Sequence, residues 1–173
     1  VTNLTLKDYL EAEKFFRSII SLKPNAENYY IYGNIQKQLK NYNEASEYFL
    51  KAINLKSDYS EAYNNLGNTK FRLGFIDEAV KNYKKAIKFN KKNFPAYFNL
   101  AHVYSEEKNF DDLKKVLQDV LKFDENNTTA LNDLGYLNLI LGNVDEGRKL
   151  FEKVINIDDC LLYTSDAADD IGR

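Results

Sequence analysis

YNNLGN (residues 63–68) contains a glycine, Gly67, that belongs to a regular series along the chain. Gly33 lies one interval before it and Gly135 lies two intervals after it, while Ala101 takes the place between them, so the pattern recurs every 34 residues. A period of this length indicates stacked structural repeats, in which each unit buries its apolar surface against its neighbours.

The second half of each repeat carries its own periodic side chains. They form three series: Ala45, Ala79, Leu113 and Gly147; Phe49, Tyr83, Leu117 and Phe151; and Ala52, Ala86, Val120 and Val154. Apolar residues at spacings of three and four are typical of a helix face. Small residues let helices approach closely, so we expect Gly33 and Gly67 to meet the alanines at 45 and 79 across a pair of antiparallel helices.

The repeat pattern also predicts where the helices lie. We expect first helices near 26–39, 60–73, 94–107 and 128–141, and second helices near 8–22, 43–56, 77–90, 111–123 and 145–157. This divides the chain into a partial repeat at 1–25 and full repeats at 26–59, 60–93, 94–127 and 128–159. Gly74 and Gly142 fall at predicted helix ends, where glycine adopts the left-handed cap without steric cost.

These repeats resemble the tetratricopeptide repeat family. The resemblance is carried by YNNLGN (63–68), DEAVKNYKKAIKFN (77–90) and NEASEYFLKAINLK (43–56), and it extends over residues 8–159. It implies an all-α fold, a right-handed superhelical solenoid of antiparallel helix pairs. Many members of this family hold a peptide in the groove lined by their first helices.

Both ends of the chain depart from the repeat pattern. CLLYTSDAADDIGR (160–173) resembles a translated sequencing adapter, so we expect the natural sequence to end near Asp159; the alternative is a genuine, weakly helical acidic tail. VTNLTLK (1–7) fits the end of a first helix, which would place the N-terminus inside a repeat. Without residues 160–173 the net charge is zero and no cysteine remains.

Composition restricts the class of protein. The 173 residues are 44% hydrophobic with a net charge of −2, which is typical of a soluble globular or solenoid chain. No apolar run approaches the roughly 20 residues of a membrane span. The lysine pairs lie on predicted second helices or turns without forming a basic stripe, so nucleic acid is not an expected partner. We favour a cytoplasmic location.

The resemblance places a binding surface on the concave face, where the second, fifth, sixth and ninth positions of each repeat point inward. The predicted peptide-binding residues are Tyr30, Ile31, Asn34, Asn64, Asn65, Asn68, Phe98, Asn99, His102, Asn132, Asp133 and Tyr136. This set is mostly neutral. Asparagine amides can both donate to and accept from a peptide backbone, and aromatic rings provide apolar anchors. The alternative is that these asparagines are consensus surface residues without a ligand.

Two known peptide-binding patterns of the family can be compared with this set. Asn65 and Asn99 match the asparagine ladder of O-linked N-acetylglucosamine transferases, although Ile31 and Asp133 interrupt it. Chaperone-binding members grip a C-terminal carboxylate with lysine and arginine. That charge-assisted contact is missing here, which disfavours a chaperone-tail adaptor. The corresponding basic positions hold Tyr30, Pro95 and Asn99.

The sequence does not predict a catalytic or metal site. His102 is the only histidine, and no cysteine, second histidine or carboxylate pair completes a metal site or a catalytic triad at a recognisable spacing. We therefore predict a protein that is not an enzyme and that needs no cofactor or metal.

Three functions follow as hypotheses. The leading one is a scaffold that binds an extended peptide segment of another protein. The second is the substrate-recognition arm of a larger enzyme, for example a glycosyltransferase, whose catalytic domain lies beyond this sequence. The third is self-association through apolar residues near the C-terminal end, which are Phe151, Val154, Ile155 and Ile157.

Overall fold

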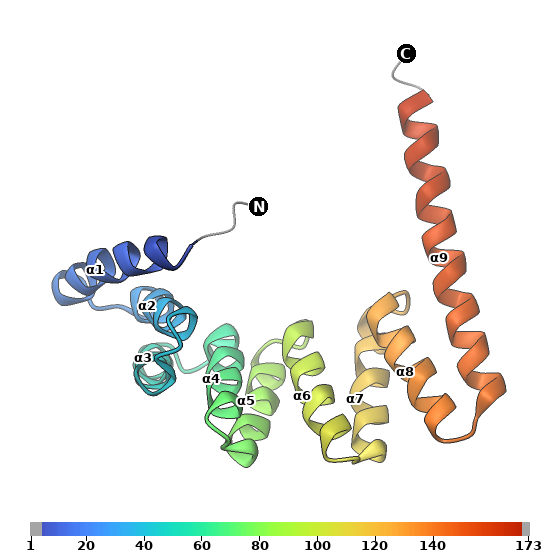
Figure 1. Cartoon of the computed structure of the whole chain (residues 1–173), viewed down its shortest axis with the longest axis horizontal. Coiled ribbons are helices and arrows are strands. Elements are labelled where there is room, and N and C mark those ends of the chain that lie inside the picture. Colours follow the sequence, from blue (N-terminus) through green and yellow to red (C-terminus); the bar gives the residue numbers. More distant parts are fainter. Residues whose placement is uncertain (1–4, 171–173) are drawn as a thin grey trace. The chain divides into compact units, whose positions relative to one another are not determined.

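The computed structural model describes the backbone of residues 5–170 and the side chains of residues 5–157. Every regular element in this range is an α-helix (Figure 1). The helices are α1 (Leu6–Leu22), α2 (Ala26–Gln38), α3 (Tyr42–Leu55), α4 (Ser60–Arg72), α5 (Ile76–Phe89), α6 (Phe94–Glu106), α7 (Phe110–Phe123), α8 (Thr128–Ile140) and α9 (Val144–Asp170). The predicted all-α repeat solenoid is confirmed, and the helix ends differ from the expected ones by at most two residues, except at the end of α9.

The chain divides into two compact units, residues 1–103 and residues 104–173, and α6 contains the boundary. In the first unit, each of the helices α1 to α4 packs against the next one, and α2 also contacts α4. The first helices of consecutive repeats therefore lie side by side. In the second unit, α7 packs against α8, and α8 packs against α9.

The turn inside each repeat has the same backbone conformation. Positive φ angles recur every 34 residues, at Lys40 (63°), Gly74 (82°), Lys108 (55°) and Gly142 (80°). In each turn the next residue donates its amide to a carbonyl five positions back, as Asn41 does to Gln36 over 2.9 Å. This is the Schellman arrangement, which satisfies the last carbonyl groups of a helix. The predicted glycine caps at 74 and 142 are confirmed.

The glycines on the first helices face aromatic rings of the second helices. A Cβ atom added at Gly33 would lie 2.8 Å from Cε1 of Phe49, and one added at Gly67 would lie 2.6 Å from Cε1 of Tyr83. The expected approach of the two small residues occurs in the fourth repeat, where a Cβ added at Gly147 would lie 2.9 Å from the carbonyl oxygen of Gly135. At Gly33 and Gly67 the nearest group is the aromatic ring, and the pairing of these glycines with the alanines at 45 and 79 stays a prediction. The ring, four positions further along the second helix, occupies the space that the missing side chain leaves.

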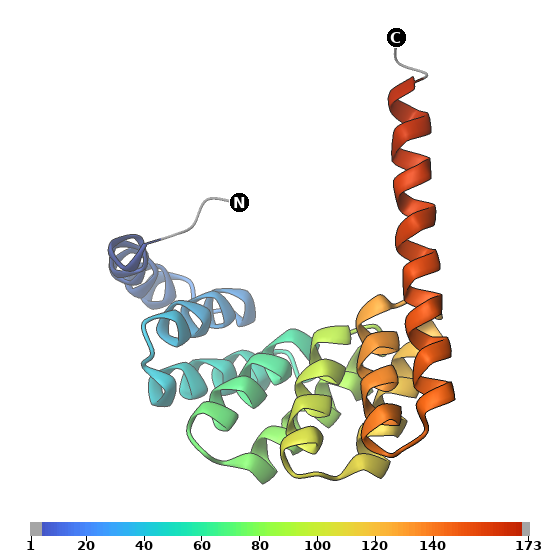
Figure 2. The same ribbon diagram turned by 45° about the vertical axis from the view of Figure 1, so that its right-hand side comes forward.

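Both ends of the helical region differ from expectation. Leu6 and Lys7 belong to α1, because Thr5 caps this helix in a capping box with Asp8, so this segment is not the end of a preceding helix. Residues 1–4 lie outside the described residues. At the other end, α9 runs past the end of α8 (Figure 2) as far as Asp170. The side chains of the adapter-like segment 160–173 also lie outside the described residues, so its origin stays a prediction.

Candidate peptide-binding groove

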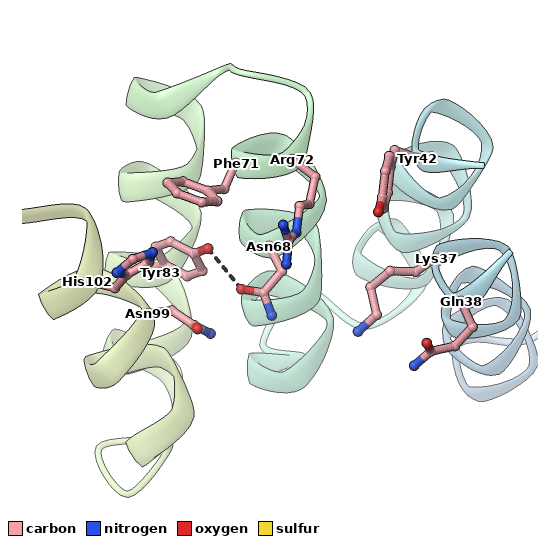
Figure 3. Close-up of a pocket in the computed structure, with 9 residues that line it drawn as sticks. All are labelled: Lys37, Gln38, Tyr42, Asn68, Phe71, Arg72, Tyr83, Asn99 and His102. Carbon is pink, nitrogen blue, oxygen red and sulfur yellow. Dashed lines mark hydrogen bonds between the residues drawn. The ribbon is translucent and has the colours of Figure 1, made fainter. Parts of the chain in front are cut away.

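The first unit contains a groove on the side of its first helices, with a volume of about 380 Å³. We call this surface the unit 1 groove. Its lining residues come from α2, α4 and α6 and from the helices paired with the first two (Figure 3). They are Lys37, Gln38, Tyr42, Asn68, Phe71, Arg72, Tyr83, Asn99 and His102.

A hydrogen-bonded cluster beside the groove joins α2 to α4. The Asn65 amide donates to Oδ1 of Asn34 over 2.8 Å and to the hydroxyl of Tyr30 over 3.1 Å. Its carbonyl oxygen accepts from Nζ of Lys37 over 3.1 Å. Asn65 therefore uses both its donor and its acceptor side on α2, which fixes its orientation and holds the two first helices together.

A second asparagine pair joins α4 to α6. The Asn99 amide donates to Oδ1 of Asn64 over 2.9 Å. Asn64 is only 8% exposed, so its side chain serves this contact rather than an open surface. Buried amides of this kind are stable only when they are hydrogen-bonded, and the Asn99 contact supplies that partner.

Tyr83 orients the amide of Asn68 toward the groove. The buried hydroxyl of Tyr83 donates to Oδ1 of Asn68 over 2.8 Å (Figure 3). Because the oxygen of the amide is occupied, its NH₂ group faces away from Tyr83. Burial raises the pKa of the Tyr83 phenol well above its ordinary value, so the hydroxyl stays protonated and keeps donating.

Aromatic and cationic groups complete the groove. The rings of Phe71 and His102 lie 5.6 Å apart between their centroids, bringing α4 and α6 together at one end. Lys37 reaches from α2 toward α4, and the guanidinium group of Arg72 lies beside Asn68 (Figure 3). Burial lowers the pKa of Lys37, because desolvation disfavours its charged form.

Profiles of a known repeat family match most of the chain. The TPR repeat profile matches residues 33–74 and 67–107, and the tetratricopeptide repeat profile matches residues 94–127 and 128–159. The chain belongs to the tetratricopeptide repeat family. A tetratricopeptide repeat fold is that of a protein interaction scaffold.

Solved tetratricopeptide proteins share this fold at low sequence identity. A crystal structure of MamA is 20% identical, with a TM-score of 0.80 over 94% of this chain and 99% of that one. MamA from Desulfovibrio magneticus RS-1 is 18% identical, with a TM-score of 0.74 over 88% and 87% of the two chains. YrrB, described as a tetratricopeptide protein with an unusual peptide-binding site, is 20% identical, with a TM-score of 0.68 over 95% and 85%. A search of curated proteins finds no match.

The structure divides the residues predicted to bind peptide into three groups. Asn68, Asn99 and His102 line the unit 1 groove. Tyr30, Asn34, Asn64 and Asn65 form the asparagine contacts beside it, while Ile31 and Phe98 are half-buried on α2 and α6. Asn132, Asp133 and Tyr136 are exposed on α8, in the second unit. Peptide binding by these residues stays a prediction.

Sequence reasoning missed several groove residues of this tetratricopeptide array. Lys37 and Arg72 make the groove cationic, whereas the sequence predicted a mostly neutral surface. A signal was available: Lys37 follows Asn34 by three positions and Arg72 follows Asn68 by four, which places each on the same helix face one turn further on. The other missed residues are Gln38, Tyr42, Phe71 and Tyr83.

The predicted absence of a metal site and of a membrane span can be compared with the described part of the chain. No group of three or more histidine, cysteine, aspartate or glutamate side chains in this part of the chain is arranged to hold a metal ion. None of the helices described has the length and apolarity of a membrane span.

The apolar residues predicted to drive self-association differ in exposure. Ile155 is 57% exposed, whereas Val154 is buried against the repeat and Phe151 and Ile157 are half-buried. Ile155 is therefore the residue of this set most available to a partner. Self-association stays a prediction.

Proposed function

We propose that this chain is a non-enzymatic interaction module that binds an extended peptide segment of another protein in the unit 1 groove. The observation that carries the proposal is the groove itself. It presents an amide donor on Asn68 and two cations beside the apolar surface of Phe71 and Tyr83. Most of the lining residues carry a polar or charged group, and amide donors beside aromatic rings suit the backbone and the apolar side chains of an extended peptide.

Family membership and one structural relative support this proposal. The tetratricopeptide repeat fold is that of an interaction scaffold, and YrrB, which shares the fold, is described as having a peptide-binding site. The asparagine contacts keep neighbouring first helices in register, so the groove exists before a ligand arrives.

Selection from a random peptide library against the purified chain tests the proposal. We expect enriched peptides whose affinity, measured by isothermal titration calorimetry, falls when Asn68 is replaced by alanine. Asn54→Ala is a matched control, because Asn54 is an exposed asparagine on α3, away from the groove lining. The proposal is wrong if no peptide is enriched, or if both variants bind the enriched peptides as tightly as the unchanged chain.

A further inference from the structure

We infer that the unit 1 groove selects a peptide with an acidic side chain, aspartate or glutamate, which is held between Lys37 and Arg72. The inference rests on the proposed function and adds the chemistry of the ligand. It identifies an anionic anchor within the peptide, at positions that differ from the chaperone-tail clamp considered above.

The charge of the groove is one-sided. None of its nine lining residues is acidic, and two of them, Lys37 and Arg72, are cations. An arginine fork and a lysine ammonium next to each other attract a carboxylate and repel another cation. The groove therefore lacks the negative partner that these two residues would need.

Several other cations of this protein, including the arginines Arg17 and Arg148, form ion pairs within the chain. Arg17 pairs with Glu13 over 2.7 Å, and Lys70 pairs with Glu78 over 2.9 Å. Arg148 lies 3.6 Å from a carboxylate oxygen of Asp145. Within the described residues, Arg72 and Lys37 form no ion pair. The contrast is strongest for Arg72, which follows Lys70 on the same helix.

The ammonium group of Lys37 is held in place by one hydrogen bond and still has donors that could bind a ligand. Its half-buried ammonium group donates to Oδ1 of Asn65, whereas an ammonium has three donors. Desolvation without a counter-charge is unfavourable, and it lowers the pKa of Lys37. A carboxylate in the groove would compensate that cost and use the remaining donors.

Asn68 supplies a further donor beside the two cations. Its NH₂ group faces away from Tyr83, and it lies one helical turn before Arg72 on the same face of α4. A carboxylate has two oxygen atoms and can accept from several donors at once. A carboxylate in the groove could therefore accept from Lys37 on α2 and from Asn68 and Arg72 on α4.

The repeat fold does not explain these cations. A residue required by the fold would recur every 34 residues, but the positions equivalent to Lys37 hold Phe71, Ser105 and Leu139. Those equivalent to Arg72 hold Gln38, Glu106 and Ile140. Cations in general stabilise the last turn of a helix. The third and fourth repeats nevertheless have no cation at either of these two positions.

Two peptide libraries test the inference with the intact chain. Both are random except at one central position, which is glutamate in the first and glutamine in the second. We expect binders from the glutamate library, and we expect glutamine at the fixed position of those peptides to weaken binding roughly 10- to 100-fold. Lys37→Gln and Arg72→Gln should each remove most of that preference.

Lys81→Gln is the matched control, since Lys81 is an exposed lysine on α5 outside the unit 1 groove. It should leave the preference unchanged. Circular dichroism melting curves show whether the variants fold, and Arg72, which is exposed and makes no internal ion pair among the described residues, is the safer of the two substitutions.

The outcomes separate this inference from the proposed function. Equal binding of the glutamate and glutamine peptides overturns the acidic anchor and leaves peptide binding intact. Loss of affinity on amidation of the peptide C-terminus would move the anion to the terminal carboxylate and also overturn it. If neither library yields a binder, both proposals are wrong.

Discussion

The ring of Tyr83 fills the space that a side chain at position 67 would need. Phe49 does the same opposite Gly33, and both rings are almost fully buried. Each glycine is therefore required by one ring on the paired helix. Because Tyr83 also orients Asn68, this packing contact reaches the wall of the unit 1 groove.

Gly67→Ala should destabilise the chain. The added Cβ would lie 2.6 Å from a ring that is buried and hydrogen-bonded, so either the ring or the helices must move. We expect a cost of about 1 to 3 kcal/mol, reduced by the roughly 1 kcal/mol of helix propensity that alanine gains over glycine. Urea unfolding followed by circular dichroism measures the change.

Gly135→Ala is the control for that prediction. Its Cβ would lie 3.0 Å from Phe151, a ring that is only half-buried and can shift. We expect this variant to unfold close to the midpoint of the unchanged chain. An equal loss of stability in both variants would show that the ring contact is not what excludes a side chain at position 67.

Tyr59 should make stability depend on pH in the alkaline range. Burial raises its pKa to about 12, whereas an unfolded tyrosine titrates near 10. The unfolded chain loses this proton first, so the contribution of Tyr59 is complete below about pH 10 and is lost as the pH rises toward 12. The absorbance of phenolate during alkaline titration follows the ionisation.

Tyr59→Phe removes the ionisable group and keeps an aromatic ring at this position. The ring centroid of Tyr59 lies 4.9 Å from that of Tyr30. The difference between the two titration curves should be a single late step. If the missing step instead lies near pH 10, Tyr59 is not desolvated and the predicted alkaline effect is absent.

Individual residues also show what a repeat pattern can and cannot predict. The periodic positions located the groove residues Asn68, Asn99 and His102, because their places follow from helix geometry. Lys37 and Arg72 do not recur between repeats, so periodicity gave no reason to select them. The asparagine contacts across helices were also unpredicted, since they depend on side-chain orientation.

At the scale of elements, the same turn is built from two kinds of residue. Glycine occupies the left-handed position in two turns and lysine occupies it in the other two, Lys40 and Lys108. A non-glycine residue in this conformation costs about 1–2 kcal/mol. Helix positions were predictable because period, apolar spacing and glycine caps agree, whereas the lysine turns carry no such sequence signal.

Lys40→Gly should therefore stabilise the turn between α2 and α3. We expect a gain of about 1 kcal/mol, because glycine removes the strain at φ 63° although it adds backbone entropy to the unfolded chain. Thermal denaturation measures it as a higher midpoint. The reciprocal change Gly74→Lys should lower the midpoint, and identical effects of both substitutions would contradict the role of the positive φ angle.

At the scale of the molecule, the last helix exceeds the repeat. α3, α5 and α7 each span 14 residues, whereas α9 spans 27. The last buried side chain on the described part of α9 is Val154. The repeat pattern therefore accounts only for the first part of α9, up to about Val154.

Removing residues 160–173 should leave the melting temperature unchanged. The packing positions of the fourth repeat all precede this segment, so its loss removes helical signal without removing a core contact of the repeat pattern. Circular dichroism of the chain ending at Asp159 tests this. A clear fall in the midpoint would show that the segment contributes to folding and is not merely appended.

The bonds that Asn65 makes to Tyr30, Asn34 and Lys37 have a consequence for the thermodynamics of association. These side chains have given up their rotational freedom during folding, so an incoming peptide does not have to immobilise them. The entropy lost on complex formation then comes mainly from the peptide. A pre-organised receptor of this kind can bind a flexible partner through few contacts.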